Sequence, residues 1–236
     1  MSKIEELKQF YKNTDTLDLQ LDFIEKLLEN NEEEIIDYHY NLLKERDDMR
    51  FFHMIRSDFK KRGSSGKSFL LHKIQHEKDL ILKSEALFII GGMKNLEEND
   101  IKIIKETANE FINKKYDYTL QYYGIIILGW LGKKEEISIL SKELFENNDE
   151  NLAAYAASAL RQIWYNHKRL KKQILNTYFK SLVNNNNNNI ESTVIACVQE
   201  LLQRKFGIKE SQYGEIYGDL DEAKAKTLKA LQKELL

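Results

Sequence analysis

The chain has 236 residues and a formal net charge of −2, and this near balance of charges argues against general binding to nucleic acid. It contains ten glycines and no proline, which disfavours turn-rich all-β folds and favours long, unbroken helices. One cysteine excludes an internal disulfide bond, no uncharged run exceeds the 15 residues from Tyr118 to Gly132, and the polar start MSKIEELKQFYKN lacks a secretion signal, so we expect a cytoplasmic protein without a membrane segment.

Residues 1–75 are predicted to form an N-terminal helical cap. Apolar residues recur at helical spacing in residues 17–28 and again in residues 35–43. Neither segment copies the pattern that follows them. An atypical first unit is expected of a repeat array, because the end of the array needs a polar outer face.

The stretch KKRGSSGKS, residues 60–68, is predicted to be a flexible basic loop. Gly66-Lys67-Ser68 resembles the end of a phosphate-binding loop, but Lys61 stands where that motif needs a glycine, and no strand precedes it. His72 and His76, four residues apart, would lie on one side of a helix. The spacing fixes no third ligand, so we expect a solvated pair and no metal site.

Residues 76–206 are predicted to contain four copies of one helical segment. The copies begin at Asp79, Asp117, Asp149 and Asn187, with spacings of 38, 32 and 38 residues. Apolar or small residues stand 3, 7, 11 and 14 positions after each start, and these offsets lie on one face of an α-helix. The opening Asp or Asn suits a helix N-cap.

A second helical pattern lies between successive copies, in residues 101–111, 137–144 and 170–182. Two antiparallel helices in every 32 to 38 residues are the unit of an α-solenoid. Tetratricopeptide and ankyrin patterns contain a proline, which leaves the HEAT and armadillo class. We therefore predict an all-α fold, a single domain in which paired helices form a right-handed α-α superhelix.

The end of the chain, residues 207–236, is predicted to be a C-terminal capping segment. The six asparagines of residues 184–189 are expected to form a flexible loop before the last repeated helix. Three glycines then end the repeat pattern. Asp219 with Glu222 resembles a capping box that opens a final helix to Leu236.

The residues of the repeat resemble the short HEAT-like repeats of the phycobilin lyase type. DENLAAYAASALRQI, residues 149–163, fits the alanines and leucine of that pattern, and LGWLG, residues 128–132, fits its ending. The resemblance covers residues 79–203, about half of the chain. The usual arginine after the first apolar position is absent from all four copies, which puts a ladder of buried arginines in doubt.

Positions that vary in character between copies identify a candidate binding surface. Trp130, for example, aligns with Gly92, Gln162 and Glu200, so stacking of the repeats does not require a tryptophan there. By the family resemblance, the second helix of each pair lines the concave surface. The candidate partner-binding residues on it are Tyr122, Tyr123, Trp130, Tyr155, Arg161 and Trp164.

Tyrosine, tryptophan and arginine are the residue types enriched in the energetic centres of protein interfaces. Two other roles for these side chains stay open: the aromatic rings fill irregular gaps between repeats, or they stack on nucleobases. No pair of carboxylates is marked by unlike surroundings, which general acid and base catalysis requires. We therefore expect a non-enzymatic protein that binds another protein and carries no cofactor or metal.

A looser resemblance suggests the partner. IIILGWLG from Ile125, followed by YAASALRQIW from Tyr155, is similar to HEAT-repeat immunity proteins of bacterial polymorphic and contact-dependent toxin systems. This implies a secreted toxin domain as the partner. A DNA glycosylase for alkylated purines, with Asp117 and Trp130 as its pair, and a scaffold or chaperone are the alternatives, and the overall acidity counts against the glycosylase.

Charge is distributed unevenly along the chain. Residues 1–50 hold 7 basic and 14 acidic residues, a net charge of −7, whereas residues 151–200 hold 6 basic and 2 acidic residues, a net charge of +4. The acidic end could steer a basic protein partner. Alternatively, it keeps the terminal cap soluble.

Overall fold

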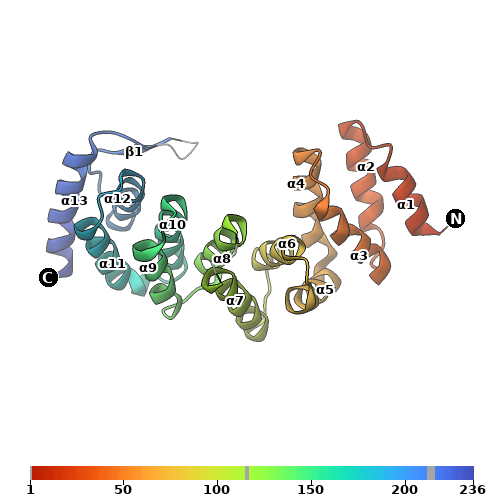
Figure 1. Cartoon of the computed structure of the whole chain (residues 1–236), viewed down its shortest axis with the longest axis horizontal. Helices are drawn as coiled ribbons and strands as arrows, with labels where there is room; N and C mark the ends of the chain where they lie inside the picture. Colours follow the sequence, from red (N-terminus) through yellow and green to blue (C-terminus); the bar gives the residue numbers. More distant parts are fainter. Residues whose placement is uncertain (1, 115–116, 212–215) are drawn as a thin grey trace. The chain divides into compact units, whose positions relative to one another are not determined.

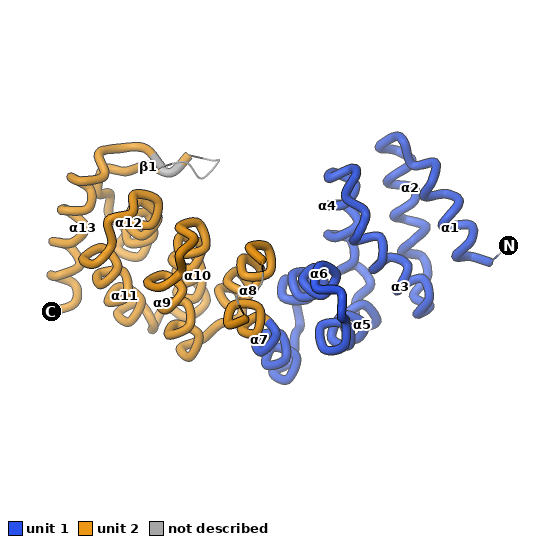
Figure 2. The backbone as a smooth tube through the Cα atoms, viewed as in Figure 1, with its two compact units in different colours: residues 1–107 blue, residues 108–236 orange. Residues whose placement is uncertain are grey.

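The computed structural model of the protein describes residues 2–114, 117–211 and 216–236, and helices make up most of them (Figure 1). No helix among the described residues combines the length and the apolar character needed to cross a membrane. The chain divides into two compact units, unit 1 with residues 1–107 and unit 2 with residues 108–236 (Figure 2).

Unit 1 is built from α-helices joined by short turns and two 3-10 segments. The 3-10 segments are η1 (Leu42–Lys44) and η2 (Phe59–Arg62). Its α-helices are α1 (Lys3–Tyr11), α2 (Leu17–Leu28), α3 (Glu33–Asn41), α4 (Met49–Asp58), α5 (Gly63–His76), α6 (Leu80–Gly91) and the first part of α7 (Glu98–Asn113). The helices predicted in residues 17–28 and 35–43 are thus confirmed.

The loop predicted for residues 60–68 is wrong, because the chain is helical there. The 3-10 turn η2 leads directly into α5. The buried side chains of Phe59 and Arg62 anchor this turn, and Gly63 adopts a positive φ of 58° at the junction, which costs a glycine little. Tertiary anchoring therefore overrides the low helix propensity of the glycine- and serine-rich stretch.

The described residues of unit 2 form the rest of α7, six further α-helices and one short β-ladder. The ladder pairs β1 (Lys209–Glu210) with β2 (Ile216–Tyr217) in antiparallel fashion. The helical segments are α8 (Tyr118–Leu131), α9 (Glu136–Glu146), α10 (Glu150–Asn166), η3 (Lys168–Leu170), α11 (Lys171–Asn184), α12 (Asn188–Leu202) and α13 (Leu220–Leu235).

The helices of unit 2 pack against their neighbours in two rows. α10 lies between α8 and α12, and these three helices form the first row. α9 and α11 pack on α10, while α13 packs on both α11 and α12. The predicted all-α class is confirmed.

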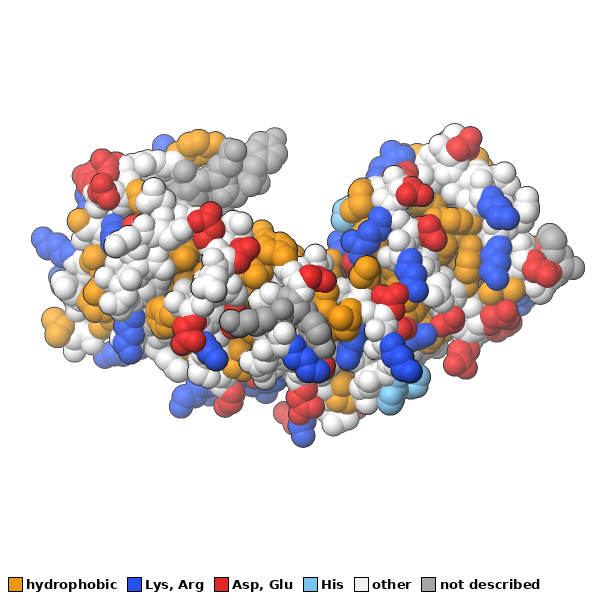
Figure 3. Space-filling view, in the orientation of Figure 1, with side chains coloured by type: hydrophobic (Ala, Val, Ile, Leu, Met, Phe, Trp, Pro, Cys, Tyr) orange, Lys and Arg blue, Asp and Glu red, His pale blue; other side chains and the backbone are white. Residues whose placement is uncertain are grey.

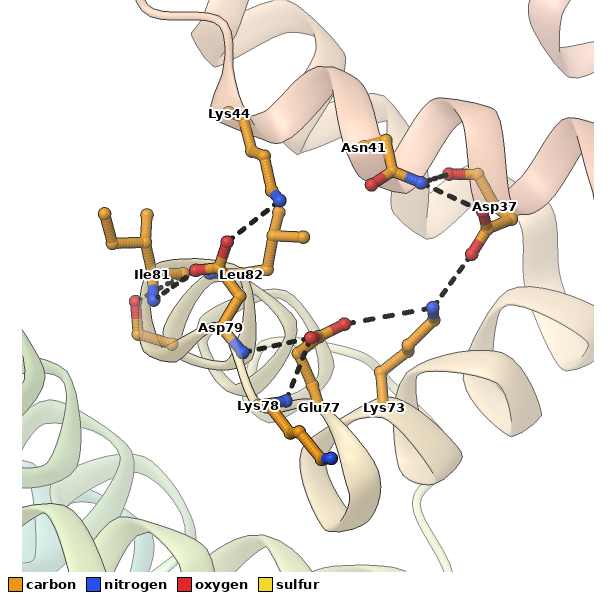
Figure 4. Close-up of polar contacts among 10 residues, drawn as sticks. Asp37, Asn41, Lys44, Lys73, Glu77, Lys78, Asp79, Ile81 and Leu82 are labelled. Atoms are coloured by element: carbon orange, nitrogen blue, oxygen red, sulfur yellow. Dashed lines mark hydrogen bonds and ion pairs between the residues drawn. The ribbon is translucent and has the colours of Figure 1, made fainter.

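The four predicted starts of the repeated segment are all helix N-caps. Asp79, Asp117, Asp149 and Asn187 each precede a helix, and each side chain accepts a hydrogen bond from a backbone N–H of its first turn. Figure 4 shows Asp79, which accepts from Ile81 and Leu82 at 3.0 and 3.2 Å and also pairs with Lys44. These caps satisfy amides that the helix itself leaves without partners.

The apolar positions of the four copies form the core of their helices. Every residue at offsets 3, 7 and 11 is buried, whereas at offset 14 Met93 and Leu131 are half-buried. Gly124 occupies a small position: a Cβ there would lie 2.6 Å from the carbonyl oxygen of Ala108, on α7. The neighbouring helix α7 therefore approaches α8 closely at this position.

Three of the six asparagines are helical, so the flexible loop predicted for residues 184–189 is wrong in extent and is confined to residues 185–187. α11 includes Asn184, and α12 begins at Asn188. Asn187 caps α12, and Asn189 donates a hydrogen bond to Asn151 on α10 at 3.0 Å.

The final helix is α13, capped by Asp219, whose side chain accepts from the backbone N–H of Glu222, as predicted.

Candidate functional site

The exposed edge of α8 carries large apolar side chains at a spacing of four residues. Tyr118, Tyr122, Ile126 and Trp130 follow one another along this edge, and all four remain at least partly exposed. Residues four apart share one side of a helix, so they form a single stripe. On the faces drawn in Figure 3, apolar side chains are exposed among charged ones in each unit.

At the beginning of α8 and α10, three tyrosines form a tyrosine cluster, defined as Tyr118, Tyr122 and Tyr155. The rings of Tyr122 and Tyr155 lie 4.6 Å apart in an edge-on arrangement, and those of Tyr118 and Tyr122 lie 6.5 Å apart and nearly parallel. The cluster spans two adjacent helices of the first row. Its rings therefore hold one another in place while part of each remains exposed.

At the other end of the same helices lies a second group, the tryptophan cluster, defined as Trp130, Arg161, Trp164 and Tyr165. The side-chain amide of Asn166 donates to the carbonyl oxygen of Trp130 at 2.9 Å. The Nζ atom of Lys168 lies 3.4 Å from the ring centre of Trp164 and 4.6 Å from that of Tyr165. Cation–π contacts therefore fix Lys168 over both rings.

Glu200 on α12 joins this cluster to the next helix. Its carboxylate pairs with Arg161, with Nη1 2.9 Å from Oε1, and accepts a hydrogen bond from the hydroxyl of Tyr165. That hydrogen bond is the largest of the effects that raise the pKa of Tyr165, and burial adds to it. The hydroxyl thus remains the donor at neutral pH and keeps the ring of Tyr165 in position.

The structure places the six sequence-predicted residues in different surroundings. Tyr122, Trp130, Tyr155 and Arg161 are half-buried on the exposed edges of α8 and α10. Tyr123 is only 7% exposed and Trp164 only 9%. Both point toward the interior because a step of one residue turns a side chain by about 100° around the helix.

The alignment of the repeat copies did not identify three side chains that complete the two clusters. Tyr118 is 43% exposed and Tyr165 is 45% exposed, and Lys168 covers the rings of the tryptophan cluster. The helical spacing held a signal for Tyr118, which lies one turn before Tyr122. Tyr165 and Lys168 lie at and beyond the end of the repeated pattern, where alignment of the copies gives no information.

Asp117 and Trp130 do not form a catalytic pair. Asp117 caps the beginning of α8, where its carboxylate accepts from the backbone N–H of Leu120, and Trp130 lies in the last turn. Thirteen residues of helix separate them by about 20 Å. The carboxylate beside an aromatic ring that a glycosylase would need is therefore not supplied by these two residues.

In unit 1 the polar side chains beside a cavity of 710 Å³ are paired with one another. Lys73 Nζ lies 2.8 Å from Asp37 Oδ1 and 3.9 Å from Glu77 Oε2 (Figure 4). The rings of His72 and His76 lie 4.6 Å apart and are both exposed. Within the described residues, no group of three or more His, Cys, Asp or Glu side chains is arranged to hold a metal ion.

Two buried polar groups of unit 1 support its packing. The ring of His39 accepts a hydrogen bond at Nδ1 from Nε of Arg62 at 2.9 Å, and its Nε2 lies 2.9 Å from the carbonyl oxygen of Ile55. Burial and the neighbouring guanidinium lower the pKa of His39 to about 3. A neutral ring that donates from Nε2 satisfies both contacts. In unit 2, the single cysteine, Cys197, is buried.

Comparison with models of known protein families and with curated protein sequences gives no match for this chain.

Proposed function

We propose that the protein is a non-enzymatic binding protein whose helix pairs form a HEAT-like α-α superhelix, and that unit 2 binds another protein through the exposed edge of α8 and α10. The observation that carries this proposal is that the same two adjacent helices, α8 and α10, carry the tyrosine cluster at one end and the tryptophan cluster at the other. Recurrent N-caps and buried positions support the repeat architecture.

The chemistry of the two clusters suits recognition rather than catalysis. Half-buried tyrosine and tryptophan rings offer large contact areas with few rotatable bonds, so little conformational entropy is lost on binding. The rings are also held by their neighbours, as in the 4.6 Å contact between Tyr122 and Tyr155. Ten residues of α10 separate Tyr155 from Tyr165, about 15 Å of helix, which gives one partner two anchor points.

We propose further that the partner is a secreted bacterial toxin domain and that the protein is its cytoplasmic immunity protein. This step rests on the similarity of IIILGWLG and YAASALRQIW to HEAT-repeat immunity proteins. The protein would then act by covering the active site of the toxin or by blocking its delivery. A gene for a toxin is accordingly expected immediately upstream.

The experiment that tests this function is co-expression with the product of the upstream gene, followed by affinity purification. The proposal predicts a stable complex and survival of cells that express the toxin. A variant with Tyr122→Ala and Tyr155→Ala should lose the complex, whereas Lys229→Ala and Lys233→Ala, exposed on α13, should retain it. Equal recovery of the complex with both variants would refute the role of the tyrosine cluster.

A further inference from the structure

The segments that follow α8, α10 and α12 each carry two consecutive basic residues. All of these side chains are exposed. The pairs begin 35 and 36 residues apart, so they follow the period of the helix pairs. We call this set the basic ridge: Lys133, Lys134, Lys168, Arg169, Arg204 and Lys205.

Hydrogen bonds and ion pairs bring the three helix ends of the basic ridge together. Asn166, at the end of α10, bonds to the carbonyl oxygen of Trp130, at the end of α8. Arg161 and Tyr165 bind Glu200 in the last turn of α12. Neighbouring helices pack 8–10 Å apart, so three adjacent ends extend over about 16–20 Å.

The basic ridge has no paired counter-charge within the described residues. Ion pairs in unit 2 use other cations, such as Arg161, Lys171 and Lys224. The nearby carboxylates bond to other groups than the ridge side chains, since Glu136 accepts from the backbone N–H of Lys133 at 2.6 Å and Glu200 binds Arg161 and Tyr165 on α10. The helix dipole favours a basic residue at the C-terminal end of each helix. It does not require two consecutive basic residues after all three helices.

We propose that the basic ridge binds an acidic segment of a protein partner, an inference that rests on the proposed function and extends its surface beyond the two clusters. A length of 16–20 Å matches about five to six residues of extended chain, at about 3.3 Å per residue. Lys168 belongs to the ridge and also covers Trp164 and Tyr165, so one partner can contact both surfaces.

Two features favour an acidic polypeptide over a nucleic acid. Trp164 is buried beneath Lys168, so its face is covered where a base would have to stack. Glu135 is exposed in the same turn as Lys133 and Lys134, and its charge opposes a continuous phosphate backbone. A polypeptide can place its carboxylates at intervals that avoid this residue.

The test measures binding of a fluorescent peptide of six alternating Asp and Glu residues by fluorescence anisotropy, at low and at physiological ionic strength. The ridge variant carries Lys134→Gln, Arg169→Gln, Arg204→Gln and Lys205→Gln. The control variant carries the same change at four exposed lysines elsewhere in unit 2, Lys172, Lys180, Lys229 and Lys233. Circular dichroism melts establish that both variants are folded.

The inference predicts that the ridge variant loses about tenfold in affinity and that the control variant loses less than about twofold, with weaker binding at higher salt. Equal losses in the two variants, no binding by the unmodified protein, or tighter binding of a duplex DNA probe would overturn it. If the ridge variant keeps its affinity for the co-purified partner while Tyr122→Ala with Tyr155→Ala abolishes it, the ridge inference fails and the proposed function stands.

Discussion

The side-chain amide of Asn166 donates a hydrogen bond to the carbonyl oxygen of Trp130 over 2.9 Å, and so joins the last turn of α10 to the last turn of α8. A polar side chain here satisfies a carbonyl that the helix leaves without an internal partner. The contact also holds the backbone of Trp130 beside Asn166 at the end of α10. The tryptophan cluster is thereby fixed before any partner arrives.

Replacing Trp130 with alanine should weaken the complex with the partner by ~2 kcal/mol or more and leave the melting temperature nearly unchanged. The reason is that Trp130 is half-buried on the exposed edge of α8, so part of the residue can contact a partner. Isothermal titration calorimetry and thermal unfolding of the same samples measure the two effects. Unchanged affinity would assign Trp130 to packing rather than to binding.

In contrast to the Trp130 variant, Leu160→Ala should lower the stability of the folded protein. Leu160 is fully buried in α10, so truncation leaves a cavity and should reduce the free energy of unfolding by ~2–5 kcal/mol. Urea denaturation measures this loss. Ser158→Ala, at a half-buried position on the same helix, is the control and should change the free energy of unfolding by less than ~1 kcal/mol.

Gly129→Ala should destabilise unit 2 by ~1–3 kcal/mol through overpacking. A Cβ at this position would lie 2.9 Å from both Cα and Cβ of Ala159 on α10, and neither atom can move without shifting that helix. The variant Thr119→Ala, exposed at the start of α8, is the control. A stability for Gly129→Ala equal to that of the unmodified protein would contradict the close packing of α8 on α10.

His39 should make unit 1 less stable in acid. Its pKa is about 3 in the folded protein, against an ordinary value of 6.5, so below pH 6.5 the unfolded chain binds more protons than the folded one. The free energy of unfolding therefore falls as the pH falls from about 6.5 toward 3, by at most about 1.4 kcal/mol per pH unit from this group.

The variant His39→Gln checks this dependence, because it removes the titrating ring while keeping a polar side chain. Between about pH 4 and pH 6, its free energy of unfolding should depend less steeply on pH than that of the unmodified protein. His72→Gln, exposed in α5, should leave the slope as it is. If the His39 and His72 variants have the same slope, the buried neutral ring does not contribute.

The sequence alone predicted the helices and their beginnings because local chemistry decides them. Asp79 and Asn187 are short side chains that accept from backbone amides, and this preference is visible without the fold. Residues 60–68 were mispredicted because their helix depends on buried Phe59 and Arg62, which are tertiary anchors. Local propensity cannot show that such anchors exist.

The candidate site was predictable in its location and less so in its members. Comparison of the repeats identified the edge that carries Tyr122, Trp130 and Tyr155. It could not separate Tyr123 and Trp164, which are buried, from their exposed neighbours, because burial at the margin of a helical face depends on the exact packing of adjacent helices. The ion pair between Arg161 and Glu200 joins positions 39 residues apart, a distance over which sequence patterns give no pairing.

The most direct test of the central claim is the dissociation constant of the complex with the upstream gene product, measured for the unmodified protein and for the variant with Tyr122→Ala, Trp130→Ala and Tyr155→Ala. The account predicts tight binding by the unmodified protein and a loss of at least about a hundredfold in the variant, with both proteins equally folded. Equal dissociation constants for the two proteins would contradict it.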